Sequence, residues 1–181
     1  MKKIITKRLI LREWQDSDLE PFTQINQDPK VLEFLPAGRS KEEVSEWILQ
    51  IKQHFKTHGF GLWAATLKDT GELIGFVGLN VPAFESHFTP CVEIGWRLGS
   101  HHWGHGYATE AAKAVLKLAF EEFGLSEVVS FAVPENNRSI KVMEKIGMIR
   151  DVKGDFRHPK LPENHRLSLH VLYSIQRPII K

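Results

Sequence analysis

The chain has 181 residues, of which 42% are apolar and 25% are charged, and its formal net charge is +2. This size suits one globular domain with a buried core, and the balanced charge argues against a protein that binds nucleic acid by bulk electrostatics. The single cysteine, Cys91, excludes an internal disulfide framework and suits a reducing cytosol. The N-terminus lacks the apolar run of a signal peptide, and no stretch approaches the roughly 20 apolar residues that cross a bilayer. We therefore expect one cytoplasmic domain over residues 1–181, with neither a membrane nor a nucleic acid as partner.

The first third of the chain predicts one strand and two helices. Residues 7–13 alternate between apolar and polar side chains, which is typical of a strand. The segments 17–20 and 40–43 both have the pattern of a capping box, which predicts a helix start at each. Gly59 fits the position that ends the second helix.

The next segment predicts a hairpin and a loop. Strands over residues 60–67 and 72–79 flank the turn residues Asp69, Thr70 and Gly71. Residues 80–90 form a loop, in which Phe84, His87 and Phe88 either border a ligand pocket or pack within the loop itself.

A strand, a glycine-rich turn and a long helix follow over residues 92–98, 99–106 and 107–123. A turn of this kind is a ready anion site, because its N–H groups are unpaired and the helix dipole adds positive charge. Gly104 and Gly106 leave no side chain between a phosphate and the backbone. The turn lacks the ending of a P-loop and the three spaced glycines of a dinucleotide fingerprint. The turn alone leaves a ligand-free connection equally open.

The last third predicts a strand over 128–133, a short helix ended by Gly147, a strand near 148–152, a polar loop over 153–165 and a long strand over 167–175. The order of elements gives an α/β (α+β) fold with a mixed, mostly antiparallel sheet of about six or seven strands and about four helices. Only the strand–helix–strand unit in the middle has to cross over, and it does so right-handed.

The segment Trp103-Gly104-His105-Gly106-Tyr107-Ala108, followed by Thr109-Glu110-Ala111, resembles the pyrophosphate loop of the GNAT acetyltransferases. That loop reads Gln/Arg-x-x-Gly-x-Gly/Ala, and this chain departs from it by placing Trp103 where Gln or Arg is usual. The version with Trp first and Gly-Tyr-Ala-Thr-Glu-Ala last is similar to the branch of the ribosomal-protein N-terminal acetyltransferases, RimJ and RimL, where this substitution is ordinary. The resemblance covers nearly the whole chain and is specific in its middle.

The resemblance implies a GNAT fold in which the strands over 92–98 and 128–133 part at their ends around acetyl-CoA, the cosubstrate. Pantetheine then fills the gap in the manner of an added strand. It implies that pantetheine pairs with the backbone of Trp96, Arg97 and Leu98. It also implies that pyrophosphate is held by the backbone amides of Trp103, Gly104, His105, Gly106, Tyr107 and Ala108.

Acetyl transfer needs a group that takes a proton from the amine and a group that helps the thiolate to leave. Glu93 is our candidate base, because it lies on the strand leading to the anion turn and the resemblance offers a glutamate there. It could equally pair with a lysine or arginine across the sheet. Asn136-x-x-Ser139 resembles the motif in which Asn contacts pantetheine and Ser lies by the thiol, so Ser139 is our candidate acid. Asn136 also suits a helix N-cap.

Two further chemistries have little support in the sequence. His101, His102 and His105 lie within five positions, but their spacing fits no zinc motif, and we expect them to add positive charge beside the pyrophosphate, with no metal. A covalent acetyl-cysteine route is disfavoured because Cys91 has no evident activating base.

The sequence therefore predicts an acetyl-CoA-dependent N-acetyltransferase that acts directly on a primary amine, in the first place the N-terminal amine of a protein. A small-molecule acceptor (a polyamine, an amino acid or an aminoglycoside) and a non-catalytic CoA-binding module are the alternatives. Asp151, Asp155 and Glu163 could serve a small-amine pocket. RNA binding has only Phe156, Arg157, His158 and Lys160 in its favour. Monomer and homodimer both stay open.

Overall fold

The computed structural model describes residues 2–178. Its elements along the chain are β1 (Ile4–Ile5), β2 (Leu9–Arg12), the 3-10 turn η1 (Asp16–Asp18), α1 (Leu19–Gln27), α2 (Pro29–Leu32), α3 (Lys41–His58), β3 (Leu62–Leu67), β4 (Leu73–Asn80), β5 (Glu93–Leu98), the 3-10 turn η2 (Ser100–His102), α4 (Tyr107–Glu121), β6 (Glu127–Ala132), α5 (Asn137–Lys145), β7 (Ile149–Arg157) and β8 (Leu169–Gln176).

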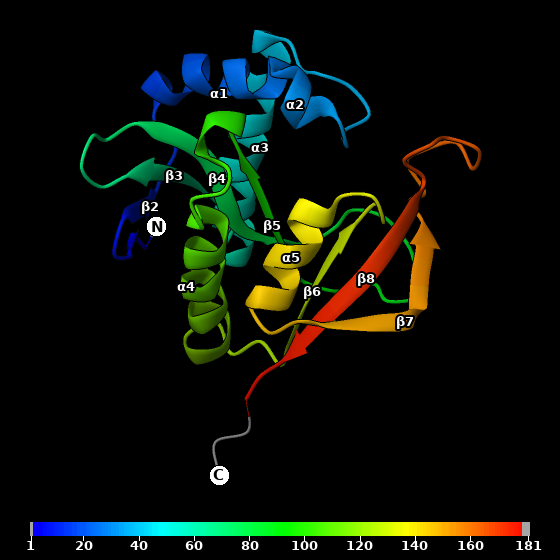
Figure 1. The fold of residues 1–181 in the computed structure, drawn as a ribbon. Helices are drawn as coiled ribbons and strands as arrows, with labels where there is room; N and C mark the ends of the chain where they lie inside the picture. The colour runs from blue at the N-terminus through cyan, green and yellow to red at the C-terminus, as the bar shows by residue number, and fades with distance from the viewer. Residues whose placement is uncertain (1, 179–181) are drawn as a thin grey trace. The chain divides into compact units, whose positions relative to one another are not determined.

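The strands follow the order β1-β2-β3-β4-β5-β6-β8-β7 in the sheet, and Figure 1 shows their paths. Neighbours from β1 to β4 are antiparallel, β5 and β6 are parallel, and β6, β8 and β7 are antiparallel again. This is the expected mixed, mostly antiparallel sheet, in which the parallel pair is joined by the crossover helix α4.

The chain divides into two compact units. Unit 1 comprises the chain up to Asn80 together with Gly95–Val115, and unit 2 comprises Val81–Ile94 and the chain from Leu116 onward. Strand β5 and helix α4 therefore contribute residues to both. The expectation of one domain over 1–181 stays a prediction, and its ends, residues 1 and 179–181, lie outside the described part of the chain.

Unit 1 is built on the antiparallel strands β2, β3 and β4 with helices α1 and α3 packed beside them (Figure 1). The predicted capping box at the start of α3 is confirmed, since the Ser40 hydroxyl accepts from the Glu43 N–H and the Glu43 carboxylate accepts from the Ser40 N–H. Helix α3 ends at Gly59, as expected. The largest fully buried side chains in this unit include Trp63, Phe22 and Leu9.

Unit 2 is built on β6, which pairs with β8 along its whole length from Glu127 to Ala132, and on β7 beside β8. Strand β5 joins β6 with Glu93 opposite Val129. The next link is made by a side chain, because the Ser130 hydroxyl donates to the Ile94 carbonyl at 2.9 Å. A side chain therefore provides a further link between these two strands.

Four details of the prediction need correction. Strand β1 and helix α2 raise the totals to eight strands and five α-helices among the described residues, and both elements are too short for a periodic pattern. The first capping box is made by Gln15 and Asp18 instead of Ser17, because the buried Asp18 carboxylate accepts from the Gln15 N–H and from Arg12. Strand β7 continues to Arg157 through residues expected in a loop.

Strand β7 was hard to predict for a physical reason. Most of its side chains are exposed, so it has no apolar face to reveal its period. Its pairing with β8 also shifts register between Asp151 and Phe156, which interrupts any alternation. Within residues 2–178, no helix is both long enough and apolar enough to span a membrane.

Candidate functional site

The turn after β5 has the backbone of an anion site. Gly104 and Gly106 have φ values of 81° and 80°, which favour glycine, and nothing lies within 4 Å of where a Cβ of Gly104 would be. Among the hydrogen bonds of the described chain, the N–H groups of Gly104, His105, Gly106, Tyr107 and Ala108 have no acceptor. These five donors lie just before and within the first turn of α4, where the helix dipole is positive. The turn therefore fits a pyrophosphate such as that of acetyl-CoA.

A network in unit 1 fixes the conformation of this turn. The Arg8 guanidinium donates to the His105 carbonyl at 2.9 Å and to the Glu110 carboxylate at 2.7 Å. Glu110 also accepts from the Arg8 N–H and from the Thr6 hydroxyl. Burial alone would raise the pKa of Glu110, but these hydrogen bonds and the charge of Arg8 hold it below its ordinary value. The loop is thus held in place before any ligand arrives.

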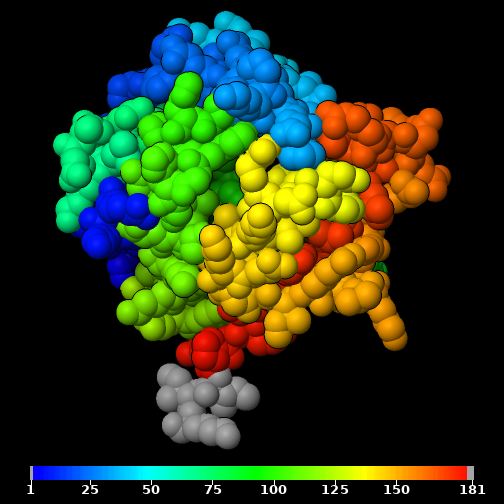
Figure 2. All heavy atoms as spheres, viewed as in Figure 1, coloured from blue at the N-terminus to red at the C-terminus, as the bar shows by residue number. Residues whose placement is uncertain are grey.

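Helix α1 and the segment after it lie against the start of the turn (Figure 2, blue against green). A Cβ on Gly99 would come within 3.3 Å of Ile25. Burial alone would raise the pKa of Asp28, yet hydrogen bonds from Ser100 and from the Lys30 N–H lower it. The early helices thus support the anion turn, a contact that the sequence pattern did not reveal.

Two histidines of the turn, His102 and His105, have different partners. His102 contacts the Glu72 carboxylate at 3.1 Å, and the His105 ring stacks on Tyr107 with centroids 5.6 Å apart. Arg8 covers the Tyr107 ring at 4.6 Å. Across residues 2–178, no group of three His, Cys, Asp or Glu side chains has the arrangement of a metal site.

Trp96, Arg97 and Leu98 lie in unit 1, in the half of β5 that leads into the turn. Leu98 is buried, and its carbonyl accepts from the Trp103 indole at 2.8 Å. The side chain of Arg97 was overlooked by sequence reasoning, which assigned only its backbone a role. It donates to the Asn26 carboxamide and lies over the Trp47 ring. Both faces of β5 are therefore covered, and simple alternation does not describe this strand.

Glu93, Asn136 and Ser139 lie in unit 2. Glu93 is partly buried at the start of β5. Burial, with the charges of Glu93 and Glu127 adding to it, raises the pKa of the Cys91 thiol to about 11. Only about one thiol in ten thousand is then ionised at neutral pH, so Cys91 is a poor nucleophile.

Asn136 is the N-cap of α5, as expected, because its side-chain oxygen accepts from the Ser139 N–H at 3.2 Å. Ser139 is partly buried, and within the described chain its hydroxyl has no hydrogen-bond partner. The cap places this hydroxyl in the first turn of the helix. It is free to donate to a ligand atom, as a leaving sulfur would require.

Unit 2 also holds an aromatic cluster that the sequence did not predict. Phe84, Phe131 and Phe156 surround His158 and His170, whose rings lie 5.3 Å apart. Burial lowers the pKa of both imidazoles, and the proximity of His170 lowers that of His158 further. Phe84 and Phe88 thus pack within unit 2 on residues distant in sequence. No local motif marks such a cluster, because its members come from the loop before β5 and from three strands.

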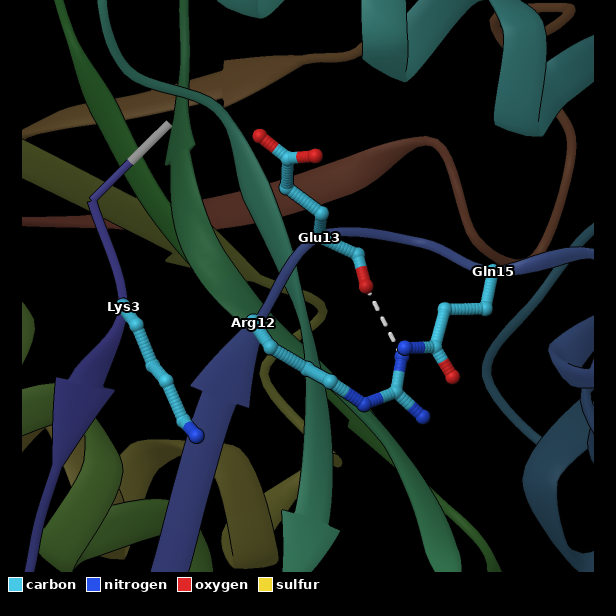
Figure 3. Close-up of a pocket in the computed structure, with 4 residues that line it drawn as sticks. All are labelled: Lys3, Arg12, Glu13 and Gln15. Atoms are coloured by element: carbon cyan, nitrogen blue, oxygen red, sulfur yellow. Dashed lines mark hydrogen bonds between the residues drawn. The ribbon is translucent and has the colours of Figure 1, made fainter.

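A shallow cavity of about 260 Å³ in unit 1 is lined by Lys3, Arg12, Glu13 and Gln15 (Figure 3). Its most prominent cation, Arg12, is already engaged, since it donates to the Glu13 carbonyl and to both oxygens of Asp18. The volume is also below that of most small-molecule sites. This cavity contains none of the predicted site residues, and we assign it no function.

Comparison with known proteins identifies the family that the chain resembles. A family model described as an acetyltransferase (GNAT) domain matches residues 8–149. The chain is 35% identical over 147 residues to the uncharacterized protein YkkB of Bacillus subtilis (strain 168), which covers 81% of this chain and 84% of that protein. A GNAT-family acetyltransferase from Bacillus anthracis is 27% identical, with a TM-score of 0.78 over 97% of this chain and 99% of that chain.

RimL, a ribosomal L7/L12 alpha-N-protein acetyltransferase in complex with coenzyme A, has the same TM-score of 0.78 at 15% identity. That match covers 97% of this chain and 98% of RimL. At this identity the likeness shows a shared fold alone.

Proposed function

We propose, from the premise that the chain belongs to the GNAT acetyltransferase family, that it transfers the acetyl group of acetyl-CoA directly to a primary amine. The observation that carries the proposal is the row of five unpaired N–H groups from Gly104 to Ala108 at the start of α4. A diphosphate suits this row better than a single carboxylate, because it presents several anionic oxygens to several donors.

Different residues of the chain would bind acetyl-CoA and assist the transfer of the acetyl group. The turn amides from Gly104 to Ala108 would hold the pyrophosphate, whereas the Trp103 N–H, which was expected to join them, donates to the Ser100 carbonyl at 3.3 Å. The backbone of Trp96, Arg97 and Leu98 would pair with pantetheine. Asn136 would contact the same arm from the cap of α5. Acetyl-CoA, once bound, supplies an activated acetyl group as a thioester.

Glu93 would take the proton that the attacking ammonium must lose, either directly or through a water molecule. The amine nitrogen then forms a bond to the acetyl carbon, the carbon–sulfur bond breaks, and the second proton that the nitrogen loses ends on the sulfur of CoA. The Ser139 hydroxyl would donate a hydrogen bond to the departing sulfur, which leaves with CoA. The unbonded state of that hydroxyl supports this role, and the thiol of Cys91, protonated at neutral pH, supports direct transfer without an acetyl-enzyme.

For the acceptor we propose the N-terminal amine of a protein, on the resemblance of the segment 103–111 to the ribosomal-protein branch. A small-amine pocket lined by free carboxylates has less support. Asp155 pairs with Arg150 at 2.8 Å, Asp151 accepts from the Lys153 N–H, and Glu163 lies 3.8 Å from Arg157. RNA binding loses two of its four candidates, because Phe156 is buried and His158 packs beside it.

The test is a calorimetric titration of the purified chain with acetyl-CoA, with and without EDTA. One-to-one binding that EDTA does not change is expected. Gly106→Ala should weaken it at least about tenfold, because the added Cβ strains a residue at φ 80° and shifts the amides. Gly71→Ala is the matched control, since Gly71 has φ 75° and open space around it but lies in the β3–β4 turn.

Absence of binding at millimolar acetyl-CoA, or an equal effect of the two alanine variants, would contradict the assignment of the turn. If binding is found, a panel of N-terminal peptides and small amines follows, with release of CoA thiol as the readout. Turnover of small amines alone would refute the proposed protein acceptor and leave the acetyltransferase assignment intact.

A further inference from the structure

Two arginines of unit 1 share a single tryptophan. Arg97, on β5, lies with its guanidinium carbon 5.0 Å from the centre of the Trp47 ring and 5.8 Å from that of Phe76. Arg39, in the segment before α3, lies 4.8 Å from the same Trp47 ring. We call Arg39, Trp47 and Arg97 the arginine–tryptophan cluster.

The cluster has two positive charges and no negative one. Within residues 2–178, neither Arg39 nor Arg97 has an ion-pair partner. Burial, with the charge of Arg39 adding to it, lowers the pKa of Arg97 to about 10. Two other arginines of the same unit do have carboxylate partners, Arg8 with Glu110 and Arg12 with Asp18. Placing two like charges together in a partly desolvated site is costly, so their arrangement calls for a compensating anion.

A purely structural role explains only part of the arrangement. Arg97 donates to the Asn26 side chain, and this uses one of its five N–H donors. The other nitrogens of Arg97 have no hydrogen-bond partner within the described chain, and Arg97 is partly buried without being completely enclosed. Arg39 is exposed and Trp47 is partly exposed. The donors of Arg39 are therefore accessible from outside, and the donors of Arg97 that Asn26 does not occupy lie beside them at the Trp47 ring.

The shape of a guanidinium indicates which anion fits. Its planar fork matches the two oxygens of a carboxylate, and stacking on an indole orients that fork while leaving its edge free. The pyrophosphate of acetyl-CoA has the unpaired amides of residues 104–108 as donors under the proposed function. The cluster is instead formed with the early helical segment, through Asn26 of α1 and Trp47 of α3.

We propose that Arg39 and Arg97, stacked on Trp47, form a subsite for a carboxylate carried by the amine acceptor. This inference rests on the proposed function and narrows its substrate class to acceptors that bear a negative charge. The carboxylate comes either from an acidic side chain near a protein N-terminus or from the α-carboxylate of a free amino acid, and the two sources are separable by experiment.

The experiment compares acceptors in matched pairs. One pair is the peptide Ala-Glu-Ala amide against Ala-Gln-Ala amide, and the other is L-alanine against L-alanine amide. Release of CoA thiol gives kcat/KM for each. The wild-type chain should prefer the carboxylate member of one pair by at least about tenfold, mainly through KM, because each pair differs by one charge-assisted interaction. The pair that shows the preference identifies the source.

Arg39→Gln should abolish most of that preference and leave the Kd for acetyl-CoA within about twofold of wild type. Arg39→Lys should retain part of it, because the charge remains but the planar fork is lost. Lys56→Gln is the matched control, an exposed charge removed from the end of α3, and it should change neither quantity. Because Arg39 is exposed, its variants should fold normally.

A wild-type chain that treats both members of each pair equally would overturn the subsite. A preference that is unchanged in Arg39→Gln would also overturn the subsite. A loss of acetyl-CoA affinity in that variant would overturn it too, because the cluster would then bind the cofactor. If neither pair of acceptors is acetylated, the acetylated forms of the two peptides are titrated into the CoA-bound chain. Equal affinity for the two peptides, or no detectable binding at millimolar concentration, also rejects the subsite. Failure to bind acetyl-CoA at all would instead refute the proposed function.

Discussion

Unit 1 and unit 2 each surround nitrogen-bearing side chains with aromatic rings, but the two surroundings leave opposite charge states. In unit 1, Arg39 and Arg97 stack on Trp47. Burial lowers the pKa of Arg97 to about 10, so its guanidinium stays charged at neutral pH. In unit 2, His158 and His170 pack among phenylalanines, and burial lowers the pKa of both, so both imidazoles are neutral at pH 7.

The difference shows that desolvation leaves two kinds of buried base in opposite charge states. Desolvation disfavours the charged form of every base, but a guanidinium begins so far above neutral pH that it keeps its charge, whereas an imidazole does not. Unit 1 thus offers permanent positive charge and oriented amides, which suit binding of anions. Unit 2 holds the neutral thiol of Cys91, the neutral histidines and the candidates Glu93 and Ser139, which suit proton transfer. Substitutions in unit 1 should therefore alter the affinity for anionic ligands, and substitutions in unit 2 should alter kcat and its dependence on pH.

The sharpest test of this division is Glu93→Gln. The substitution keeps the size and hydrogen-bonding ability of the side chain but removes its basicity. We expect kcat to fall by about 10²–10⁴-fold, the usual contribution of a general base, with the Kd for acetyl-CoA unchanged. Stopped-flow or steady-state rates with an active acceptor, together with a calorimetric titration, measure both quantities.

The pH–rate profile provides the control for that variant. If Glu93 is the base, the acidic limb of the wild-type profile should disappear in Glu93→Gln. A variant that keeps the wild-type limb would show that the proton leaves by another route. A Glu93→Gln variant that loses affinity for acetyl-CoA would contradict the expectation that unit 2 affects turnover and unit 1 affects affinity.

A smaller effect is expected for Ser139→Ala. The variant removes one hydrogen bond to a sulfur that gains negative charge, and about a tenfold loss of kcat is reasonable for such a bond. The cap of α5 should survive, because Asn136 accepts from the main-chain N–H of residue 139 and not from its hydroxyl. Ser139→Cys, which restores a donor, should recover part of the rate. A full-rate alanine variant would remove Ser139 from the mechanism.

The sequence predicted most of the fold, and it did so where a local rule applies. Alternation marked the buried strands, Ser40 and Glu43 marked the start of α3, and Asn136 marked the cap of α5. The segment from Trp103 to Ala108 predicted the tight turn before α4, because the glycines that permit its backbone are themselves the signal, and its binding of an anion stays a prediction. Exposed strand β7 was truncated in the prediction, because a solvated strand has no periodic apolar face.

The parts of the site that could not be predicted depend on contacts between residues far apart in sequence. Arg97 read as an outward-facing residue of an alternating strand, and only the packing of Asn26 and Trp47 against it reveals two unpaired arginines. His158 and His170 are twelve positions apart and meet because β7 and β8 pair. Arg8 and Glu110, which brace the turn, are separated by 102 positions. Sequence patterns encode local conformation, and such pairings appear only when the sheet is assembled.

The smallest effect concerns stability in unit 2. Because the pKa of His170 is lowered in the folded chain, the unfolded chain, with its ordinary value near 6.5, binds more protons as the pH falls below that value. Above it both states are neutral and the residue makes no pH-dependent contribution, so stability should decrease only on the acidic side. Thermal unfolding between pH 7.5 and 5.5 should show Tm falling with pH, and His170→Phe should reduce that fall by a few degrees at most. Equal slopes for wild type and His170→Phe would mean that the imidazole of unit 2 is not kept neutral by burial, and the contrast between the two units would then rest on Arg39 and Arg97 alone.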